Sequence, residues 1–308
     1  MAKVKGTLIS GSSKADKQKN KVAERVRSQR RHKKSSLEKP LITVVTAVFN
    51  AEIHLEETIQ SIIQQTYDNI EYIVIDGRST DGTLDIIKKY EEHIDYWISE
   101  SDEGMYDALS KGFSLAEGDL ICYLNAGDLF FSKSMETAAS YFKETKVKWF
   151  TGFRSVCNEE SCVTGVDLPY QYSPKLIREG VYGRHLPFIQ QESTIWHKDL
   201  MCLVNMDMFR KLKLAGDYYL WFCFSFKEEL AIVKTLVGIF KKHDGQLSEN
   251  LIGYWKEVDL FSKKVKLTTR LKICFEMSIW ALHPKIRRFF KKNVWGYDHL
   301  KKSWRKGL

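Results

Sequence analysis

The sequence lacks any long run of uncharged apolar residues. Its two best candidates, Ala231–Phe240 and Ile273–Leu282, each contain a charge and fall short of the ~18 residues of a membrane-spanning helix. Residues 1–21 also lack the apolar stretch of a secretory signal. We therefore expect neither a membrane span nor an export signal. We predict a cytoplasmic protein, and peripheral attachment to the cytoplasmic face of a membrane stays open.

The sequence also lacks the cysteine spacing of common metal sites. The six cysteines form no C-x-x-C pair. Cys157 and Cys162 are close in sequence, but neither a second pair nor a nearby histidine completes a metal site. Because no export signal directs the chain to an oxidising compartment, we expect all six thiols to be reduced and structural.

Charge is distributed unevenly along the chain. Residues 1–40 contain 13 Lys and Arg against 3 Asp and Glu, and residues 261–308 contain 14 against 2. The residues between them contain 21 basic and 34 acidic side chains, so the formal net charge of +9 comes from the two ends. We therefore do not expect a basic, nucleic-acid-binding core.

Strand and helix patterns alternate from residue 41 to residue 124. Continuous apolar, β-branched runs predict strands buried on both faces, and apolar residues three or four apart predict helices between them. The predicted strands are 41–48, 70–75, 96–98 and 119–124, and the predicted helices are 52–65, 84–90 and 105–115. Thr80 and Asp81 can cap the second helix. The alternation predicts an α/β fold with a mostly parallel sheet flanked by helices.

The two basic ends are expected to lie outside this α/β domain. We predict a mobile segment over residues 1–39, the domain over 40–250, and a basic amphipathic helical extension over 251–308. Five aromatic residues of the extension could anchor it on an anionic membrane surface or pack on the domain: Trp280, Phe289, Phe290, Trp295 and Trp304. Both interpretations stay open, whereas no recognition motif supports nucleic acid as a partner.

Polar side chains stand where the predicted strands end. Thr46 and Asn50 close the first strand, Asp76 closes the second, and Asn125 and Asp128 follow the fourth. In an open α/β sheet, ligands bind at the carboxyl ends of the strands. Asp and Asn are common in turns for local reasons, but their joint placement predicts a site for a ligand with hydroxyls, a base edge or a metal-bound phosphate.

Five longer motifs occur in a fixed order. TAVFNAEIHLEETIQSIIQQTYDNIEYIVIDGRSTDGT is followed by SESDEGMYDALSKGFSLAEGDLICYLNAGD, IQQESTIWHKDL, LAGDYYLW and FKKHDGQLS. Together they resemble glycosyltransferase family two, the inverting sugar-nucleotide transferases of GT-A fold, in the branch that makes bacterial surface polysaccharides. The resemblance covers about residues 41–250. It implies transfer of a sugar from a nucleoside-diphosphate-sugar donor to a hydroxyl of a glycan or lipid-linked acceptor, with inversion.

The resemblance implies a nucleoside site at the first two strand ends. Asp76 would accept hydrogen bonds from the nucleobase or the ribose, with Thr46 and Asn50 in support. Arg78 departs from the Gly or Asp that is more usual there, and it contacts either a phosphate or solvent.

Other residues are implied near the sugar and the diphosphate. Asp107 and Lys111, at i and i+4 of one helix, form either a surface ion pair or donor contacts. NAGD at 125–128 occupies the place of the family's Asp-x-Asp motif, so Asn125 would contact the donor and Asp128 would supply one carboxylate to Mg²⁺ or Mn²⁺. His243 is either a second metal ligand or a surface histidine. The metal would stabilise the departing diphosphate.

Asp217, in LAGDYYLW, is the candidate catalytic base. Small residues before it and an aromatic-rich helix after it allow partial desolvation, which raises the pKa of a carboxyl toward useful basicity. Asp217 also suits the N-cap of a helix over residues 218–226, and both roles can hold. The resemblance places the base here, and it implies that Gln191 and Glu192 line the acceptor or donor-sugar side. Trp221 could stack on a sugar face, although tryptophan more often packs in a core.

A function from another class also fits the sequence. The chain could be a non-catalytic basic adaptor that binds membrane or nucleic acid through its ends, on a scaffold derived from a transferase. The departures at Arg78 and Asn125 keep this alternative open. Binding of a nucleotide would separate the two, because the adaptor needs none.

Overall fold

The computed structural model describes most of the chain. The described residues are 24–27, 33–36, 38–169, 171–243, 245–263, 265–290 and 293–308. Most of the segment 1–39, which we expected to be mobile, lies outside the described residues.

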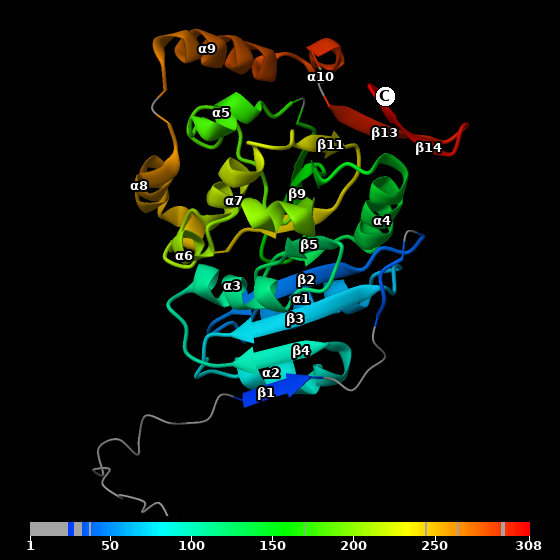
Figure 1. The fold of residues 1–308 in the computed structure, drawn as a ribbon, viewed down its shortest axis with the longest axis vertical. Helices are drawn as coiled ribbons and strands as arrows, with labels where there is room; N and C mark the ends of the chain where they lie inside the picture. Colours follow the sequence, from blue (N-terminus) through cyan, green and yellow to red (C-terminus); the bar gives the residue numbers. More distant parts are fainter. Residues whose placement is uncertain are drawn as a thin grey trace, which may run out of the picture.

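A ten-stranded sheet runs through the molecule (Figure 1). In spatial order its strands are β1 (Glu24–Arg27), β4 (Tyr96–Ser99), β3 (Ile70–Asp76), β2 (Ile42–Val48), β5 (Leu120–Tyr123), β10 (Thr194–His197), β7 (Trp149–Thr151), β11 (Ala231–Val233), β13 (Val294–Asp298) and β14 (Ser303–Lys306). Strands β4, β3, β2 and β5 run parallel, as do β7, β11 and β13. The predicted α/β fold with a mostly parallel sheet is confirmed.

Alternate residues of β2 feed two apolar cores, one on each face of the sheet, because successive side chains of a strand point in opposite directions. Val45 and Ala47 pack in the core under α3 (Met105–Leu115). Val44 and Val48 pack in the opposite core, which is covered by α1 (Leu55–Ile63), α2 (Thr83–Lys89) and α4 (Ser134–Thr145). Every residue of β2 is therefore buried, as its continuous apolar run predicts.

The first two helices do not begin at their predicted positions: α1 starts three residues later and α2 one residue earlier. Helix α1 starts at Leu55 rather than at residue 52, and Ile53, counted on its apolar face, is 79% exposed in the preceding turn. Helix α2 starts at Thr83, whose N–H donates to Asp81 at 3.0 Å. Asp81 therefore supports the first turn as expected, whereas the Thr80 N–H donates elsewhere, to the side chain of Asn50.

The remaining elements build a second part beside the strands β10, β7 and β11. A four-stranded sheet contains, in spatial order, β6 (Leu129–Phe130), β12 (Gly238–Lys241), β8 (Arg154–Cys157) and β9 (Val163–Asp167). The helices of this part are α5 (Pro174–Arg178), α6 (Met206–Phe209), α7 (Gly216–Phe224), α8 (Leu251–Phe261), α9 (Leu267–Ala281) and α10 (Pro284–Arg287). Short 3-10 turns cover Glu91–His93, Lys198–Leu203, Leu247–Glu249 and Arg288–Phe290.

The C-terminal residues are not the purely helical extension that the composition suggested. After three helices the chain forms β13, which pairs parallel with β11, and β14, which pairs with β13. Trp304 is 9% exposed, and its ring lies 5.4 Å from that of Tyr141 on α4. Trp295 packs edge-to-face on the same tyrosine. Two of the five aromatic residues thus pack in the apolar core on the α4 side of the sheet.

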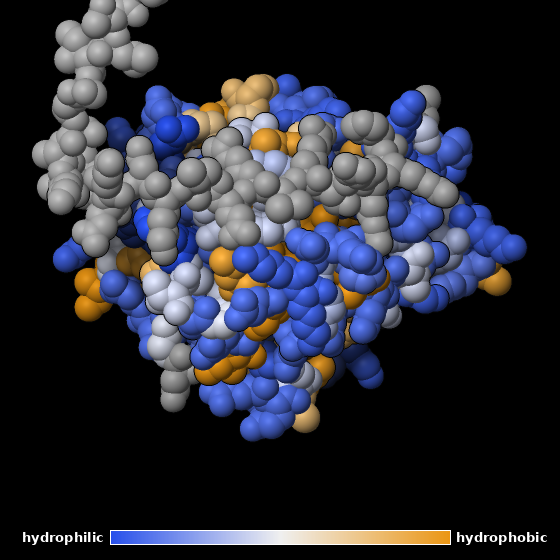
Figure 2. Space-filling model, turned by 90° about the horizontal axis from the view of Figure 1, so that it is seen from below, coloured by the Kyte–Doolittle hydropathy of each residue, from blue (hydrophilic) through white to orange (hydrophobic). Residues whose placement is uncertain are grey.

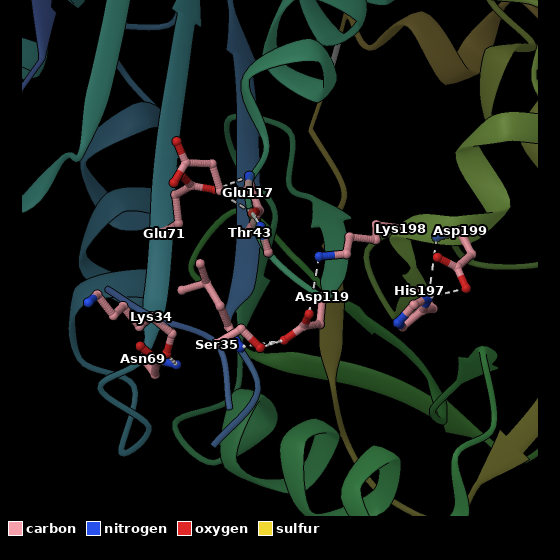
Figure 3. Close-up of polar contacts among 12 residues, drawn as sticks. Lys34, Ser35, Thr43, Asn69, Glu71, Glu117, Asp119, His197, Lys198 and Asp199 are labelled. Atoms are coloured by element: carbon pink, nitrogen blue, oxygen red, sulfur yellow. Dashed lines mark hydrogen bonds and ion pairs between the residues drawn. The ribbon is translucent and has the colours of Figure 1, made fainter. Parts of the chain in front are cut away.

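At the amino ends of the strands, polar side chains link neighbouring segments through hydrogen bonds and an ion pair (Figure 3). The Asp119 carboxylate accepts hydrogen bonds from the Ser35 hydroxyl and from the N–H of Leu41, and it pairs with Lys198 at 3.2 Å. Glu71, in which burial raises the pKa, accepts from the Thr43 hydroxyl. The acids at this edge are thus satisfied by the chain itself.

The described surface is largely polar on the face seen from below, where hydrophobic residues form small separate patches (Figure 2). None of the helices within the described residues is long and apolar enough to cross a bilayer. All six cysteines are free thiols; Cys122, Cys157 and Cys223 are buried, whereas Cys162, Cys202 and Cys274 are exposed.

The hairpin of β13 and β14 allows the packing of Trp304 to be tested. We expect Trp304→Ala to lower the free energy of unfolding by about 3 kcal/mol, because it empties a buried aromatic contact. Leu300→Ala is the matched control in the turn of the same hairpin. Leu300 is 96% exposed, so its loss should change stability by less than about 0.5 kcal/mol. Equal effects in chemical denaturation would show that the hairpin does not pack as described.

Candidate active site

The loop after β3 is held by two side chains that we predicted to contact a donor. Asp76 lies level with Ser99 of β4, and its carboxylate is fully buried. It accepts hydrogen bonds at 2.5 Å from the hydroxyls of Ser79 and Ser99, and a further one from the Ser79 N–H. Asn50, at a φ of 48°, accepts from the Thr80 N–H at 2.9 Å. The Asp76 oxygens thus shape the loop in this structure, and contact of Asp76 with a donor stays a prediction.

The sequence analysis missed two side chains at this edge. Thr46 is fully buried and accepts a hydrogen bond from the Tyr72 hydroxyl, so it does not reach the surface. Phe49, however, is 63% exposed, and Asp102 lies beside Gly77, where a Cβ atom would come within 2.6 Å of Asp102 Oδ2. Burial raises the pKa of Asp102. The sequence analysis missed Phe49 and Asp102 because both lie in loops with no pattern of their own.

Asp107 and Lys111 form the predicted i,i+4 contact on α3. Their charged atoms are 3.6 Å apart, and the Lys111 ammonium also lies 3.1 Å from Glu100. Arg78, at a φ of 66°, is exposed. The structure thus contains the surface ion pair, and contact of these residues with a donor stays a prediction.

The loop after β5 brings together two predicted residues with unsatisfied oxygens. The Asn125 amide donates to Gln191 Oε1 at 3.3 Å, and Gln191 donates to the Tyr123 carbonyl. Within the described part of the chain, Asn125 Oδ1 and Glu192 Oε1 are buried without a hydrogen-bond partner. Buried polar atoms are normally paired. These two oxygens therefore lack partners that a bound group would supply.

Asp128 and Glu192 are buried carboxyls with little compensation. Asp128 is 4% exposed and accepts from the Lys241 N–H at 3.1 Å, while the Lys241 ammonium pairs with Glu57 at 2.6 Å. Burial raises the pKa of Asp128 to about 7. Burial, and next the charge of Asp128, raise the pKa of Glu192 well above its usual range. The nearby ammonium is thus directed to Glu57, and both acids of this pair bind a proton more readily than an exposed carboxyl does.

Two histidines lie beside this loop. His243 comes close to Gly127, where a Cβ atom would lie 3.6 Å from His243 Nε2; Gly127 also has a φ of +105°. The His54 ring stacks on His243 with centroids 4.2 Å apart. Burial and the neighbouring His243 lower the pKa of His54. The sequence analysis singled out His243 but missed His54, which precedes α1 in an otherwise ordinary helical pattern.

The donor atoms at this place suit a hard divalent cation. Mg²⁺ and Mn²⁺ prefer carboxylate and carbonyl oxygens, and they commonly bind through one or two carboxylates plus substrate phosphates. Asp128 and the unsatisfied oxygen of Asn125 fit this chemistry, with His243 beside them. No three His, Cys, Asp or Glu side chains among the described residues form a ready metal cluster. Any metal would therefore rely on ligand phosphates.

Asp217 lies at the start of α7 and is half-buried. The N-cap position is Ala215, so the expectation that Asp217 caps the helix is corrected by two residues. Its carboxylate accepts hydrogen bonds from the Tyr254 hydroxyl, at 3.0 and 3.2 Å, and from the Tyr218 N–H at 2.7 Å. Burial raises the pKa of Asp217 to about 6, against the opposing effect of these bonds.

Helix α8 fixes the turn that presents Asp217. The Glu257 carboxylate accepts three backbone N–H groups, those of residues 213–215, at 2.8 to 2.9 Å. Gly216 follows and packs on the Tyr106 ring, where a Cβ atom would lie only 2.3 Å away. Tyr254 and Glu257 belong to residues 251–308, which we expected to lie outside the domain. Nothing in the composition of that segment indicated a role at the site.

Trp221 does not line a site. Its side chain is 1% exposed, and its ring packs on those of Trp149 and Trp196, both with centroids 5.8 Å away. The expectation that it faces a sugar is corrected, because α7 turns this residue into the core beneath the sheet. Its packing fixes the helix that carries Asp217.

The predicted residues fall into two groups. After burial and the neighbouring Tyr106, the charges of Asp217, Glu192 and Asp128 all raise the pKa of Tyr123, and the charges of Asp128 and Asp217 also contribute to the raised pKa of Glu192. Asp76 belongs instead with Asp102 at the first strand ends, since its charge raises the pKa of that residue. One group thus lies around β3 and the other around β5 and α7.

The sequence model of glycosyl transferase family 2 matches residues 43–209, more than half of the chain. The chain belongs to glycosyl transferase family 2. The putative glycosyltransferase EpsE of Bacillus subtilis is 24% identical over 267 residues, which cover 85% of this chain and 94% of that protein. The family match ends before Asp217, which therefore lies outside it.

Two solved structures share the fold of this glycosyltransferase. S. aureus TarS 1-349 in complex with UDP-GlcNAc has a TM-score of 0.57 at 15% identity, covering 81% of this chain and 70% of that one. The mannosyltransferase PcManGT from Pyrobaculum calidifontis, in complex with GDP-Man and Mn²⁺, has a TM-score of 0.51 at 16% identity, covering 73% and 66%. At these identities the likeness shows the fold alone, the GT-A arrangement. The family membership makes the chain a nucleotide-sugar-dependent glycosyltransferase.

Proposed function

We propose that this glycosyltransferase moves a sugar, with inversion, from a nucleoside-diphosphate-sugar to a hydroxyl of a glycan or lipid-linked acceptor in surface-polysaccharide synthesis. One observation carries the proposal: the half-buried Asp217 carboxyl is held by the Tyr254 hydroxyl at 3.0 Å, and its charge, like that of the buried Asp128, acts on the buried Glu192. A base and a cation-attracting group are what a single displacement from a diphosphate needs.

The nucleoside would bind at the ends of β2 and β3. Asp76 and Asn50 fix the loop after β3 through its serine and threonine. Phe49 offers an exposed aromatic face on which a base can stack, and Asp102 offers acceptor oxygens for a ribose or base edge. Asp107 and Lys111 lie nearby in sequence on α3 and would contact the donor at its sugar or phosphate end.

The diphosphate would lie at the loop after β5. Asp128 and His243 would hold a divalent metal together with the donor phosphates, and Asn125 would add its unsatisfied oxygen or contact the donor. A bound Mg²⁺ or Mn²⁺ supplies Lewis-acid stabilisation of the departing diphosphate. The burial of Asp128 supports this proposal, because a bound cation would favour the charged carboxylate that burial disfavours.

The acceptor hydroxyl would lose its proton to Asp217. The acceptor oxygen forms a bond to the anomeric carbon while the bond from that carbon to the diphosphate breaks, and the acceptor proton passes to the Asp217 carboxylate. Tyr254 orients the carboxylate through its hydroxyl. Gln191 and Glu192 would line the acceptor or sugar side, while residues 251–308 are the proposed contact with an anionic membrane surface on which a lipid-linked acceptor would lie.

Asp217→Asn tests the base directly. The amide keeps the shape and can still accept from Tyr254, but it cannot take the proton. Transfer should fall by ~10²–10⁴-fold, the usual worth of a general base, while donor affinity in calorimetric titration stays near normal. Asp207→Asn, on an exposed side chain of α6, is the control and should leave transfer unchanged. Near-full transfer by Asp217→Asn would move the base elsewhere, with Glu192 the next carboxyl to test.

The pH dependence of transfer tests the role of Tyr254. With a pKa of about 6, Asp217 gains basic form as the pH rises, so kcat should increase between pH 5 and pH 7. The Tyr254 hydroxyl favours the charged carboxylate. Tyr254→Phe should therefore raise the pKa further and shift this limb upward by about one pH unit. A limb that stays in place would exclude Asp217 as the titrating base.

A further inference from the structure

Helix α9 carries an exposed apolar stripe. It lies as an outer layer at the end of the molecule opposite β1 (Figure 1). Its inner side is buried through Thr269, Ile273, Glu276 and Ile279. Its outer side presents Leu267, Leu271 and Phe275, one turn apart, with exposed fractions of 76%, 73% and 58%. Soluble proteins rarely expose such a contiguous stripe without a partner.

The apolar surface continues beyond α9. Ile286 on α10 is 49% exposed, and Phe289 in the following turn is 76% exposed. These two side chains, unlike the core residues Trp295 and Trp304, remain at the surface. Exposed apolar side chains thus extend over residues 267–290, whereas the two tryptophans of the terminal hairpin are packed.

The charges around the stripe have one sign. Glu276 is the single acidic residue between positions 261 and 297, and it is 2% exposed with its carboxylate bonded to the Gln171 amide. Lys266, Arg270 and Lys285 are exposed. The outer side of α9 and its flanks thus combine apolar side chains with positive charge and keep the segment's acid inside.

We propose that the outer side of α9 docks in the plane of an anionic lipid surface, with Leu267, Leu271 and Phe275 among the acyl chains and Lys266, Arg270 and Lys285 near the headgroups. Interfacial helices have this combination of apolar stripe and basic flanks. The use of such docking rests on the proposed transfer to a lipid-linked acceptor.

Charge also discriminates against another occupant. A symmetric dimer through this face would bring the same patch of two copies together, and so set Arg270 and its basic neighbours against themselves. A bilayer rich in anionic lipids supplies the opposite charge along the whole stripe. The apolar side chains, in turn, gain nothing from a nucleic-acid backbone.

The docked helix would be close in sequence to the catalytic machinery. Residues 262–266 join α9 to α8, and α8 supplies Tyr254 to Asp217 and Glu257 to the turn before it. Docking through α9 would thus hold the helix that positions the proposed base near the lipid headgroups, where the hydroxyl of a lipid-linked acceptor lies.

Vesicle co-sedimentation of the full chain tests this proposal. The vesicles contain phosphatidylcholine alone or phosphatidylcholine mixed with phosphatidylglycerol. We expect binding to the anionic vesicles that weakens with salt, and an at least tenfold loss of binding in Leu271→Glu/Phe275→Glu. The matched control is Ile252→Glu/Leu260→Glu, which adds the same charge to exposed positions of α8, 73% and 70% exposed. The basic N-terminal residues are present in both variants, so their attraction to lipid is equal.

The control adds its two charges away from the proposed docking face, so it should lose no more than about threefold, through long-range repulsion that salt screens. Equal losses in the two variants, or no binding of the wild-type chain to anionic vesicles at low salt, would overturn the proposal. So would a dimer in solution that Leu271→Glu/Phe275→Glu dissociates without any vesicle binding by the wild type. Hydrolysis of a soluble donor should be unchanged in both variants; a chain that binds vesicles but handles no donor would contradict the proposed function and leave the docking intact.

Discussion

A buried carboxylate is stable only where hydrogen-bond donors or cations replace the water it has lost, and this chain supplies such groups unevenly. Asp76 receives two serine hydroxyls and a backbone N–H, and Glu257 receives three backbone N–H groups. These well-supplied acids fix loops. Asp128 and Glu192 are buried with far fewer donors, so burial raises the pKa of each. The supply of hydrogen-bond donors thus distinguishes the acids that hold the fold from the two acids that we propose to act on a ligand.

The same constraint explains how the site is assembled from distant parts of the chain. The register of β2, β3 and β4 sets Asp76 level with Ser99, which closes one side of the donor edge. The ammonium of Lys241 pairs with Glu57 instead of Asp128, which leaves the second group of acids short of positive charge. Helix α8 then holds Asp217 through Tyr254 and keeps its carboxylate partly desolvated. Each of these arrangements depends on hydrogen-bond donors or cations from distant parts of the chain, so no local sequence motif contains it.

The sequence predicted the first half of the fold well, because local patterns dominate there. The apolar run of β2 and the helical spacing of α3 depend only on residues next to one another. Thr46 and Asp76 were placed correctly at strand ends, but which face of the strand a side chain takes depends on its pairing with neighbouring strands. Tyr254 escaped prediction because its contact with Asp217 spans 37 residues and is a matter of tertiary packing. The charge composition also led us to predict a helical extension where the terminal strands lie. The basic side chains of these strands gave no indication that two of their tryptophans are packed.

We propose that Asp128, the undercompensated acid after β5, binds a cation that arrives with a nucleoside diphosphate. Thermal unfolding of the full chain with UDP-, GDP- and dTDP-sugars, each with and without Mn²⁺, tests this proposal. We expect one nucleotide to raise the melting temperature in the presence of Mn²⁺, the rise to be much smaller without the metal, and Asp128→Asn to remove the difference. No rise with any nucleotide, or a rise that neither the metal nor Asp128→Asn affects, would contradict it.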